Sequence, residues 1–259
     1  MSELTRSLRA CKFGFCFAMF GLGGLLIRGV VFPGMMLVPR GQRREQMAKN
    51  LIGRAMALFV WLMRVTGAVS VSIEGAEKLD REGLLILANH PSLIDVVILM
   101  SLITRPDCIV KAALWRNPFT AGPVRVAGYI SNATGPELVS DAIDSLTRGN
   151  NLIVFPEGTR TGPAGEMQFQ RGAANIAVRG KRPVTPVVIT VSEQTLTKSS
   201  KWYRPPARKP HFRIHVLDDV AVEPLIAGHG EPAMQARWLT TWLEQFFERE
   251  IARHGPTGQ

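Results

Sequence analysis

The sequence predicts an α/β fold in which a mixed, mainly parallel sheet is flanked by helices, and two observations support this prediction. From residue 69 onward, short apolar segments of strand length alternate with segments of helical periodicity. Strands that alternate with helices build sheets that are covered on both faces. In addition, 46% of the 259 residues are apolar, which suffices for a sizeable core. Before residue 69 the pattern differs, because two long apolar helical segments precede the first strand.

The two N-terminal segments are apolar enough to meet a membrane. Residues 13–27 carry no charge, and the apolar run resumes after Arg28 and continues to residue 38. One spanning helix needs about 20 apolar residues, so this segment could cross a bilayer. It could equally dip in and return, because glycines and Pro33 permit breaks, and basic residues at both ends favour this re-entrant hairpin. A cleavable signal peptide is less favoured, because a second apolar helix is predicted soon afterwards at residues 45–68. This second helix could lie on the bilayer or pack against the first, and an ordinary buried helix is an equal alternative.

The elements of the α/β part follow in order. Strands are predicted from apolar and β-branched runs at residues 69–75, 84–89, 108–111, 128–131, 151–156, 184–192 and 211–217. Helices are predicted from periodic apolar residues at 92–103, 136–149, 171–180 and 232–254. Ser92 is the expected N-cap of the first of these helices. The chain therefore divides into membrane-associated helices at 1–68 and an α/β domain at 69–259.

Net charge indicates the kind of partner, and the cysteine content bears on disulfides and zinc sites. The formal net charge of +10 suggests an anionic partner, whereas three cysteines without paired spacing indicate neither a disulfide framework nor a zinc site. Residues 198–213 interleave basic and aromatic side chains, which suits single-stranded nucleic acid, anionic lipid headgroups or simply a solvated loop. The apolar N-terminal helices decide for lipid, so we expect a lipid membrane as partner and no nucleic acid.

A histidine and an aspartate stand at the end of a predicted buried strand, in the stretch NHPSLID. If the helix begins at Ser92 or the next residue, Asp95 lies on or near its first turn and can reach back to His90. A carboxylate bonded to one ring nitrogen selects the histidine tautomer and makes the other nitrogen a better base. Such a base can remove the proton of an alcohol. Taken alone, a pair of this kind is more often structural than catalytic.

A second polar segment, EGTR, follows the predicted strand at 151–156. Gly158 allows a ligand to approach the backbone closely, and Arg160 offers a planar fork suited to phosphate or carboxylate. Glu157 can accept hydrogen bonds from hydroxyls or pair with Arg160. The alternative is a surface turn with a local ion pair.

Together these segments resemble the PlsC-like family of glycerolipid acyltransferases, which includes 1-acylglycerol-3-phosphate and other lysophospholipid acyltransferases. One family motif is a histidine, four residues and an aspartate (HX4D), and another is a Phe-Pro-Glu-Gly-Thr/Ser-Arg run, matched here by NHPSLID and FPEGTR. Lys111 fits a basic position in the block between them, and Arg171 lies in a matching FQRGAA segment. Further matched positions are Pro118, Gly128, Phe169, Gly172 and Pro186. The resemblance covers roughly residues 70 to 192.

The resemblance implies a membrane-bound enzyme of lipid metabolism and phospholipid biosynthesis, at the cytoplasmic face of the bacterial inner membrane. It would transfer an acyl group from acyl-CoA or acyl-carrier protein to the hydroxyl of a lysophospholipid-type acceptor, without a cofactor or metal. His90 would be the general base and Asp95 would orient it, with no covalent acyl intermediate. The residues that the resemblance implies for binding of the acceptor are Glu157, Gly158, Thr159, Arg160, Lys111 and Arg171.

One departure from the family pattern concerns the acceptor. Many members that use a glycerol-phosphate acceptor carry an arginine just after the strand of the second motif, where this sequence has Asn132. Asparagine cannot replace a guanidinium at a phosphate. Two alternatives therefore stay open: transfer to a non-glycerol-phosphate or specialised lipid acceptor, and a non-catalytic lipid-binding relative. A serine hydrolase is disfavoured, because no serine stands in a GxSxG context.

Overall fold

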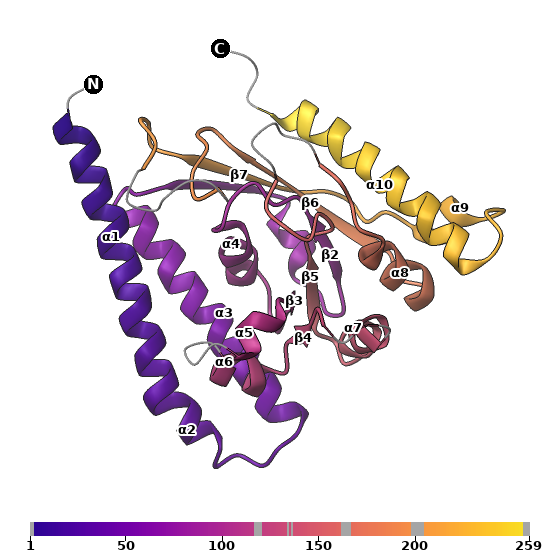
Figure 1. Ribbon diagram of the computed structural model, residues 1–259, viewed down its shortest axis with the longest axis horizontal. Helices are drawn as coiled ribbons and strands as arrows, with labels where there is room; N and C mark the ends of the chain where they lie inside the picture. Colours follow the sequence, from indigo (N-terminus) through magenta and orange to yellow (C-terminus); the bar gives the residue numbers. More distant parts are fainter. Residues whose placement is uncertain are drawn as a thin grey trace.

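The computed structural model describes residues 3–116, 121–133, 135, 137–161, 167–197 and 205–255. Within these residues, a seven-stranded sheet in the order β1-β7-β6-β2-β5-β3-β4 forms the centre of the molecule (Figure 1). Its strands are β1 (Ser70–Glu74), β2 (Leu85–Ala88), β3 (Pro106–Val110), β4 (Ile130–Ser131), β5 (Asn151–Val154), β6 (Val184–Val191) and β7 (His211–Val216). The β6–β7 pair is antiparallel and the other pairs are parallel. The prediction of a mixed, mainly parallel sheet is confirmed.

The helices include each one that the sequence predicts. They are α1 (Glu3–Leu26), the π-helical η1 (Ile27–Val31), α2 (Phe32–Met35), α3 (Gln42–Val65), the 3₁₀ turn η2 (Ala76–Leu79), α4 (Asp95–Leu102), α5 (Ala112–Arg116), α6 (Ala121–Ala127), α7 (Glu137–Thr147), α8 (Arg171–Gly180), α9 (Val222–Ile226) and α10 (Pro232–His254). The short helices α5, α6 and α9 were not predicted, because two turns or fewer show no repeated apolar period.

Two apolar layers cover the sheet, as the alternation of strands and helices predicts. The four residues of β2 are all buried. Ile86 and Ala88 belong to the core shared with α3 and α4, whereas Leu85 and Leu87 belong to the core shared with α7, α8 and α10. Successive strand side chains point to opposite faces, so an uninterrupted apolar run marks a strand that is buried on both sides. Figure 1 shows α8 and α10 on one side of the sheet and α3 and α4 on the other.

The N-terminal segment is a helical hairpin. From α1 the chain continues as helix through η1 and α2, reverses between Met36 and Gly41, and returns as α3. In Figure 1, α1 lies along the outer side of α3. Neither the glycines nor Pro33 reverses the chain within residues 3–35, so the re-entrant hairpin favoured for the first apolar segment is wrong. A π-helical turn precedes the proline, and the hairpin is instead formed by this helix and α3. The stretch Ser7–Met35 is long and apolar enough to cross a membrane, and only 11% of the apolar 18-residue segment within it is buried.

Candidate active site

The two polar segments singled out in the sequence meet at the carboxyl ends of neighbouring strands in the middle of the sheet. Strands β2 and β5 are parallel neighbours, with Leu87 opposite Val154. His90 and Glu157 each follow three residues later, so the register places them side by side. The backbone N–H of His90 donates to Glu157 Oε1 over 2.8 Å, and the N–H of Thr161 donates to the His90 carbonyl, also over 2.8 Å. The two segments are therefore joined directly by hydrogen bonds.

His90 and Asp95 form a hydrogen-bonded dyad. His90 Nδ1 lies 3.1 Å from Asp95 Oδ2, which also accepts the N–H of Ser92 over 2.6 Å. The His90 ring stacks on Phe155 with the ring centroids 4.1 Å apart. Asp95 is fully buried, while 15% of the His90 side chain is exposed. Since Nδ1 is engaged by the carboxylate, Nε2 is the ring nitrogen that can act on a substrate.

The predicted role of Ser92 as an N-cap is wrong. Helix α4 begins at Asp95, and its N-cap residue Ile94 makes no side-chain cap. The Ser92 hydroxyl is buried and donates instead to the carbonyl of Thr195 over 2.9 Å. The turn before α4 is held by the loop that follows β6, a long-range contact that local sequence patterns do not contain. The prediction that Asp95 lies on the first turn of the helix is confirmed.

Burial shapes the acid–base properties of both carboxylates. Desolvation raises the pKa of Asp95 to about 6, although the bonds from His90 and Ser92 act in the opposite direction. Burial also raises the pKa of Glu157, against the bonds from the His90 N–H and the Thr161 hydroxyl. Of the two alternatives for Glu157, the bond to a hydroxyl is the one observed, with Thr161 Oγ1 3.1 Å from Oε1.

The loop after β5 is held in a tight turn. Gly158 has φ +65, in the left-handed region that favours glycine, and donates its N–H to the Phe155 carbonyl over 3.0 Å. Gly158 and Thr159 are exposed. Arg160 Nη1 donates to the carbonyls of Leu196 and Thr197, both over 2.8 Å. The backbone at Gly158 and Thr159 is therefore accessible, while one nitrogen of Arg160 is already engaged.

The two remaining basic candidates, Lys111 and Arg171, lie near the same carboxyl end of the sheet. Lys111 is exposed directly after β3, two strands or about 10 Å from β2. Arg171 is the exposed first residue of α8, just after Gln170, whose N–H donates to the Pro156 carbonyl over 2.7 Å. Parallel strands bring their carboxyl ends to one side, which explains why residues from distant segments converge here.

Asn132 has a structural contact that the sequence did not reveal. Its side-chain oxygen accepts the N–H of Ala112 over 2.9 Å, and its backbone N–H donates to Val110 over 2.9 Å. Asn132 therefore joins β4 to the segment that contains Lys111. Pro118, and the basic and aromatic residues at 198–204, lie outside the described residues.

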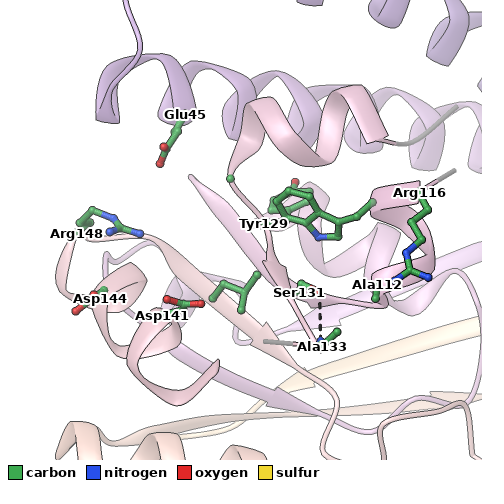
Figure 2. A pocket seen from close by; sticks show the side chains of 12 residues that line it. Glu45, Ala112, Arg116, Tyr129, Ser131, Ala133, Asp141, Asp144 and Arg148 are labelled. Carbon is green, nitrogen blue, oxygen red and sulfur yellow. Dashed lines mark hydrogen bonds between the residues drawn. The ribbon is translucent and has the colours of Figure 1, made fainter. Parts of the chain in front are cut away.

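A cavity of about 560 Å³ opens beside β4, at the edge of the sheet. Its lining residues are Glu45, Ala112, Trp115, Arg116, Gly128, Tyr129, Ile130, Ser131, Ala133, Asp141, Asp144 and Arg148. Figure 2 shows Glu45, Arg148 and Asp144 on one side of this cavity and Arg116 and Ala112 on the other. The His90–Asp95 dyad and the loop after β5 do not line it, so it is separate from the candidate active site.

Residues 70–190 match the family model described as Acyltransferase, and both the dyad and the loop after β5 lie within this range. Residues 70–190 form an acyltransferase-family domain. The resemblance to PlsC-like glycerolipid acyltransferases that the motifs indicated is thereby confirmed.

Related proteins match this acyltransferase domain and part of its surroundings. A 1-acyl-sn-glycerol-3-phosphate acyltransferase of Saccharomyces cerevisiae is 32% identical over 145 residues, which is 51% of this chain and 46% of the yeast protein. A putative 1-acyl-sn-glycerol-3-phosphate acyltransferase of Caenorhabditis elegans is 30% identical over 182 residues, or 65% of this chain and 61% of that protein. The chain thus spans about half the length of these curated relatives.

A solved structure resembles nearly the whole chain in fold. The crystal structure of the 1-acyl-sn-glycerophosphate acyltransferase PlsC from Thermotoga maritima has a TM-score of 0.64 and 20% sequence identity. The match covers 98% of this chain and 99% of that chain. The two proteins therefore share a fold that includes the N-terminal segment.

Proposed function

We propose that the protein is a membrane-bound O-acyltransferase that transfers an acyl group from acyl-CoA or acyl-carrier protein to the hydroxyl of a lysophospholipid-type acceptor. The observation that carries the proposal is the bond between His90 Nδ1 and the buried Asp95, beside the loop at 156–160. The names of the related proteins support a lysophosphatidic acid acceptor.

The proposed reaction needs one base and two positioned substrates. His90 Nε2 takes the proton of the acceptor hydroxyl as its oxygen attacks the thioester carbonyl carbon. The tetrahedral intermediate collapses with cleavage of the C–S bond, and the leaving thiolate takes the proton from His90. Asp95 stabilises the transient imidazolium, and the stacked Phe155 keeps the ring plane in place. No cofactor or metal is required, because the thioester supplies the activated acyl group.

The acceptor is proposed to bind across the carboxyl ends of β2, β5 and β3. Exposed backbone at Gly158 and Thr159 can approach a polar headgroup, and Lys111 and Arg171 contribute positive charge at this edge. Arg160 stands in the same loop, and Glu157 holds that loop against His90. Holding donor and acceptor together would supply most of the rate enhancement.

An acceptor without a glycerol phosphate is the second candidate, and a specific contact favours it. Asn132 uses its side-chain oxygen to bond Ala112, so it supplies no positive charge where many family members carry arginine. We therefore infer that phosphate recognition at this edge depends on Lys111, Arg171 and Arg160, or that the acceptor is a specialised lipid.

Membrane attachment by the N-terminal hairpin, at the cytoplasmic face of the bacterial inner membrane, completes the proposal. Its support is the apolar exposed stretch Ser7–Met35. Lysolipid acceptor and acyl chain both reside in the bilayer, so attachment would bring the site to its substrates.

The test is acyl transfer by purified protein in lipid nanodiscs, with acyl-CoA or acyl-carrier protein as donor and a panel of phosphate-bearing and phosphate-free lysolipids. Wild type should form product with at least one pair, and the variant His90→Ala should lose at least about 100-fold in rate while staying folded. Equal rates for wild type and variant would remove His90 from the mechanism. No product with any pair would favour the non-catalytic lipid-binding alternative.

A further inference from the structure

The loop at residues 192–197, which follows β6, contacts both sequence segments of the candidate site. Three consecutive carbonyls of this loop accept hydrogen bonds from those segments. The Thr195 carbonyl accepts the Ser92 hydroxyl over 2.9 Å, and the Leu196 carbonyl accepts the N–H of Leu93 over 3.1 Å. Ser92 and Leu93 lie between His90 and Asp95, so these two bonds hold the turn that carries the dyad.

Arg160 reaches the same loop from the other segment. Its Nη1 donates to the carbonyls of Leu196 and Thr197, both over 2.8 Å. The Leu196 oxygen therefore accepts from Leu93 and from Arg160, and the two motifs meet at one atom. A planar guanidinium presents its N–H groups in fixed directions, so a nitrogen that bridges two carbonyls constrains both.

The backbone of this loop adopts a conformation that it would not hold alone. Leu196 has φ +51, a left-handed conformation that is unfavourable for a side chain of its size. Its side chain is 5% exposed and belongs to the core cluster that also contains Ile94. Strained residues persist only where the surroundings over-determine them. Here the surroundings are the buried side chain and the bonds to the carbonyls.

We propose that the 192–197 loop positions the catalytic turn and that Arg160 acts on the reaction through this loop, as a positioning residue. The inference rests on the proposed function. When Nη1 is removed, the Leu196 and Thr197 carbonyls lose a charged donor, and the loop can relax away from Ser92 and Leu93. The turn then moves, and a displacement of about 1 Å at a catalytic group can reduce the rate about 100-fold.

The first test is hydrogen exchange of the full chain in nanodiscs. Arg160→Gln and Ser92→Ala should each speed hydrogen exchange at the backbone amide of Leu93 at least about 10-fold, because this amide is bonded to the Leu196 carbonyl and Leu93 itself is exposed. The matched control is Arg237→Gln, an exposed arginine on α10, which should leave that amide unchanged. Unchanged exchange at Leu93 in Arg160→Gln would overturn the proposal. If Arg160→Gln does not fold, Arg160→Lys keeps the charge but lacks the planar guanidinium that holds the two carbonyls in fixed directions, and the same criterion applies.

The second test is a double-mutant cycle on kcat and KM. The two variants are Arg160→Gln and Ser92→Ala. If both side chains act through the 192–197 loop, each single variant lowers kcat about 10-fold, and the double variant stays within about 3-fold of the worse single variant. Losses that multiply would show that Arg160 and Ser92 act independently, and an Arg160 effect confined to the KM of the acceptor would show that Arg160 acts on the acceptor. Either result would overturn the proposal. An inactive wild type would refute the proposed function, whereas the exchange measurement would still decide the role of the loop.

Discussion

At the scale of single residues, the dyad places a carboxylate where water does not reach it. Asp95 Oδ2 accepts from His90 and Ser92, while Oδ1 has no hydrogen-bond partner among the described residues. Burial therefore raises the pKa of Asp95 to about 6, above the ordinary value of 3.8. A raised pKa means that the protonated form stabilises the fold fully below about pH 4, and that this contribution is lost as the pH rises through about 6. Ionised Asp95 thus costs stability at the pH where a general base must work.

The variant Asp95→Asn should separate stability from activity. At pH 8 its melting temperature should rise by about 3–6 °C, because the cost of the buried charge disappears, and at pH 4 the difference should vanish. Its acyl-transfer rate should fall at least about 100-fold, because an amide no longer stabilises the imidazolium. Melting curves and initial rates on one preparation measure both effects.

The same arrangement predicts a loss of wild-type activity on the acid side, centred near pH 6, because a dyad that has taken up a proton cannot accept another. The comparison is Glu157→Gln, which removes the other buried carboxylate and should retain this acid limb.

A melting temperature of Asp95→Asn at pH 8 below that of wild type would contradict the assignment of a destabilising charge.

At the scale of elements, an ion pair inserted into the core joins the hairpin to the sheet. Lys49 of α3 lies 2.8 Å from Asp107 of β3, and both side chains are 1% exposed. Asp107 also accepts the N–H of Cys108 over 2.9 Å and the hydroxyl of Ser145. The Lys49 ammonium lies 5.1 Å from the ring centroid of Tyr129. Helix α3 is therefore bound to the strand whose end carries a candidate substrate-binding lysine.

Removal of one partner of this pair should be costly. The variant Lys49→Met leaves Asp107 buried without its counter-ion, so we expect a loss of about 3–5 kcal/mol in the free energy of unfolding. Denaturant or thermal unfolding in detergent measures the loss. The double variant Lys49→Met with Asp107→Asn removes both charges and keeps an acceptor for Ser145, so it should recover part of the stability. A double variant that is less stable than Lys49→Met would show that the ion pair is not the source of the loss.

At the scale of the whole molecule, the hairpin presents apolar side chains that the domain does not cover. On α1 the exposed large apolar residues are Leu8, Phe15, Met19, Phe20, Leu22, Leu25 and Leu26. An exposed apolar surface of this extent is typical of a membrane contact. The inner helix α3 is packed against α4 but also exposes Met47, Leu58, Trp61 and Val65, so both helices of the hairpin present apolar side chains, and α1 is the outer of the two (Figure 1).

Charges on the outer helix should therefore weaken membrane binding. Leu22 and Leu26 are 60% and 61% exposed and stand one turn apart, and their joint substitution by aspartate should reduce binding to anionic vesicles at least about 10-fold. Met234→Asp is the matched control, because Met234 is 63% exposed but lies on α10, across the sheet from the hairpin. Vesicle sedimentation measures both. Equal loss in the control, or no loss in the double variant, would place the membrane contact elsewhere.

The motifs and the strands next to them were predictable because their determinants are local. Four apolar residues form β2 and three of the four residues of β5 are apolar, and His90, Asp95 and Glu157 stand within a few residues of those strand ends. Asn132 was noted in the sequence only as a departure from a pattern, because its bond to Ala112 spans 20 residues. The short helix α5, which begins at Ala112, has too few residues to show a period.

By itself, the sequence determined the α/β class, the apolar N-terminal helices and the identity of the dyad, since each depends on residue type and short-range spacing. Only the tertiary structure decided that Ser92 bonds the loop after β6, that Arg160 bonds the same loop, and that Lys49 pairs with Asp107. The physical reason is distance along the chain. These bonds join residues 103, 36 and 58 positions apart, and their partners, for Ser92 and Arg160, are backbone carbonyls that every residue possesses.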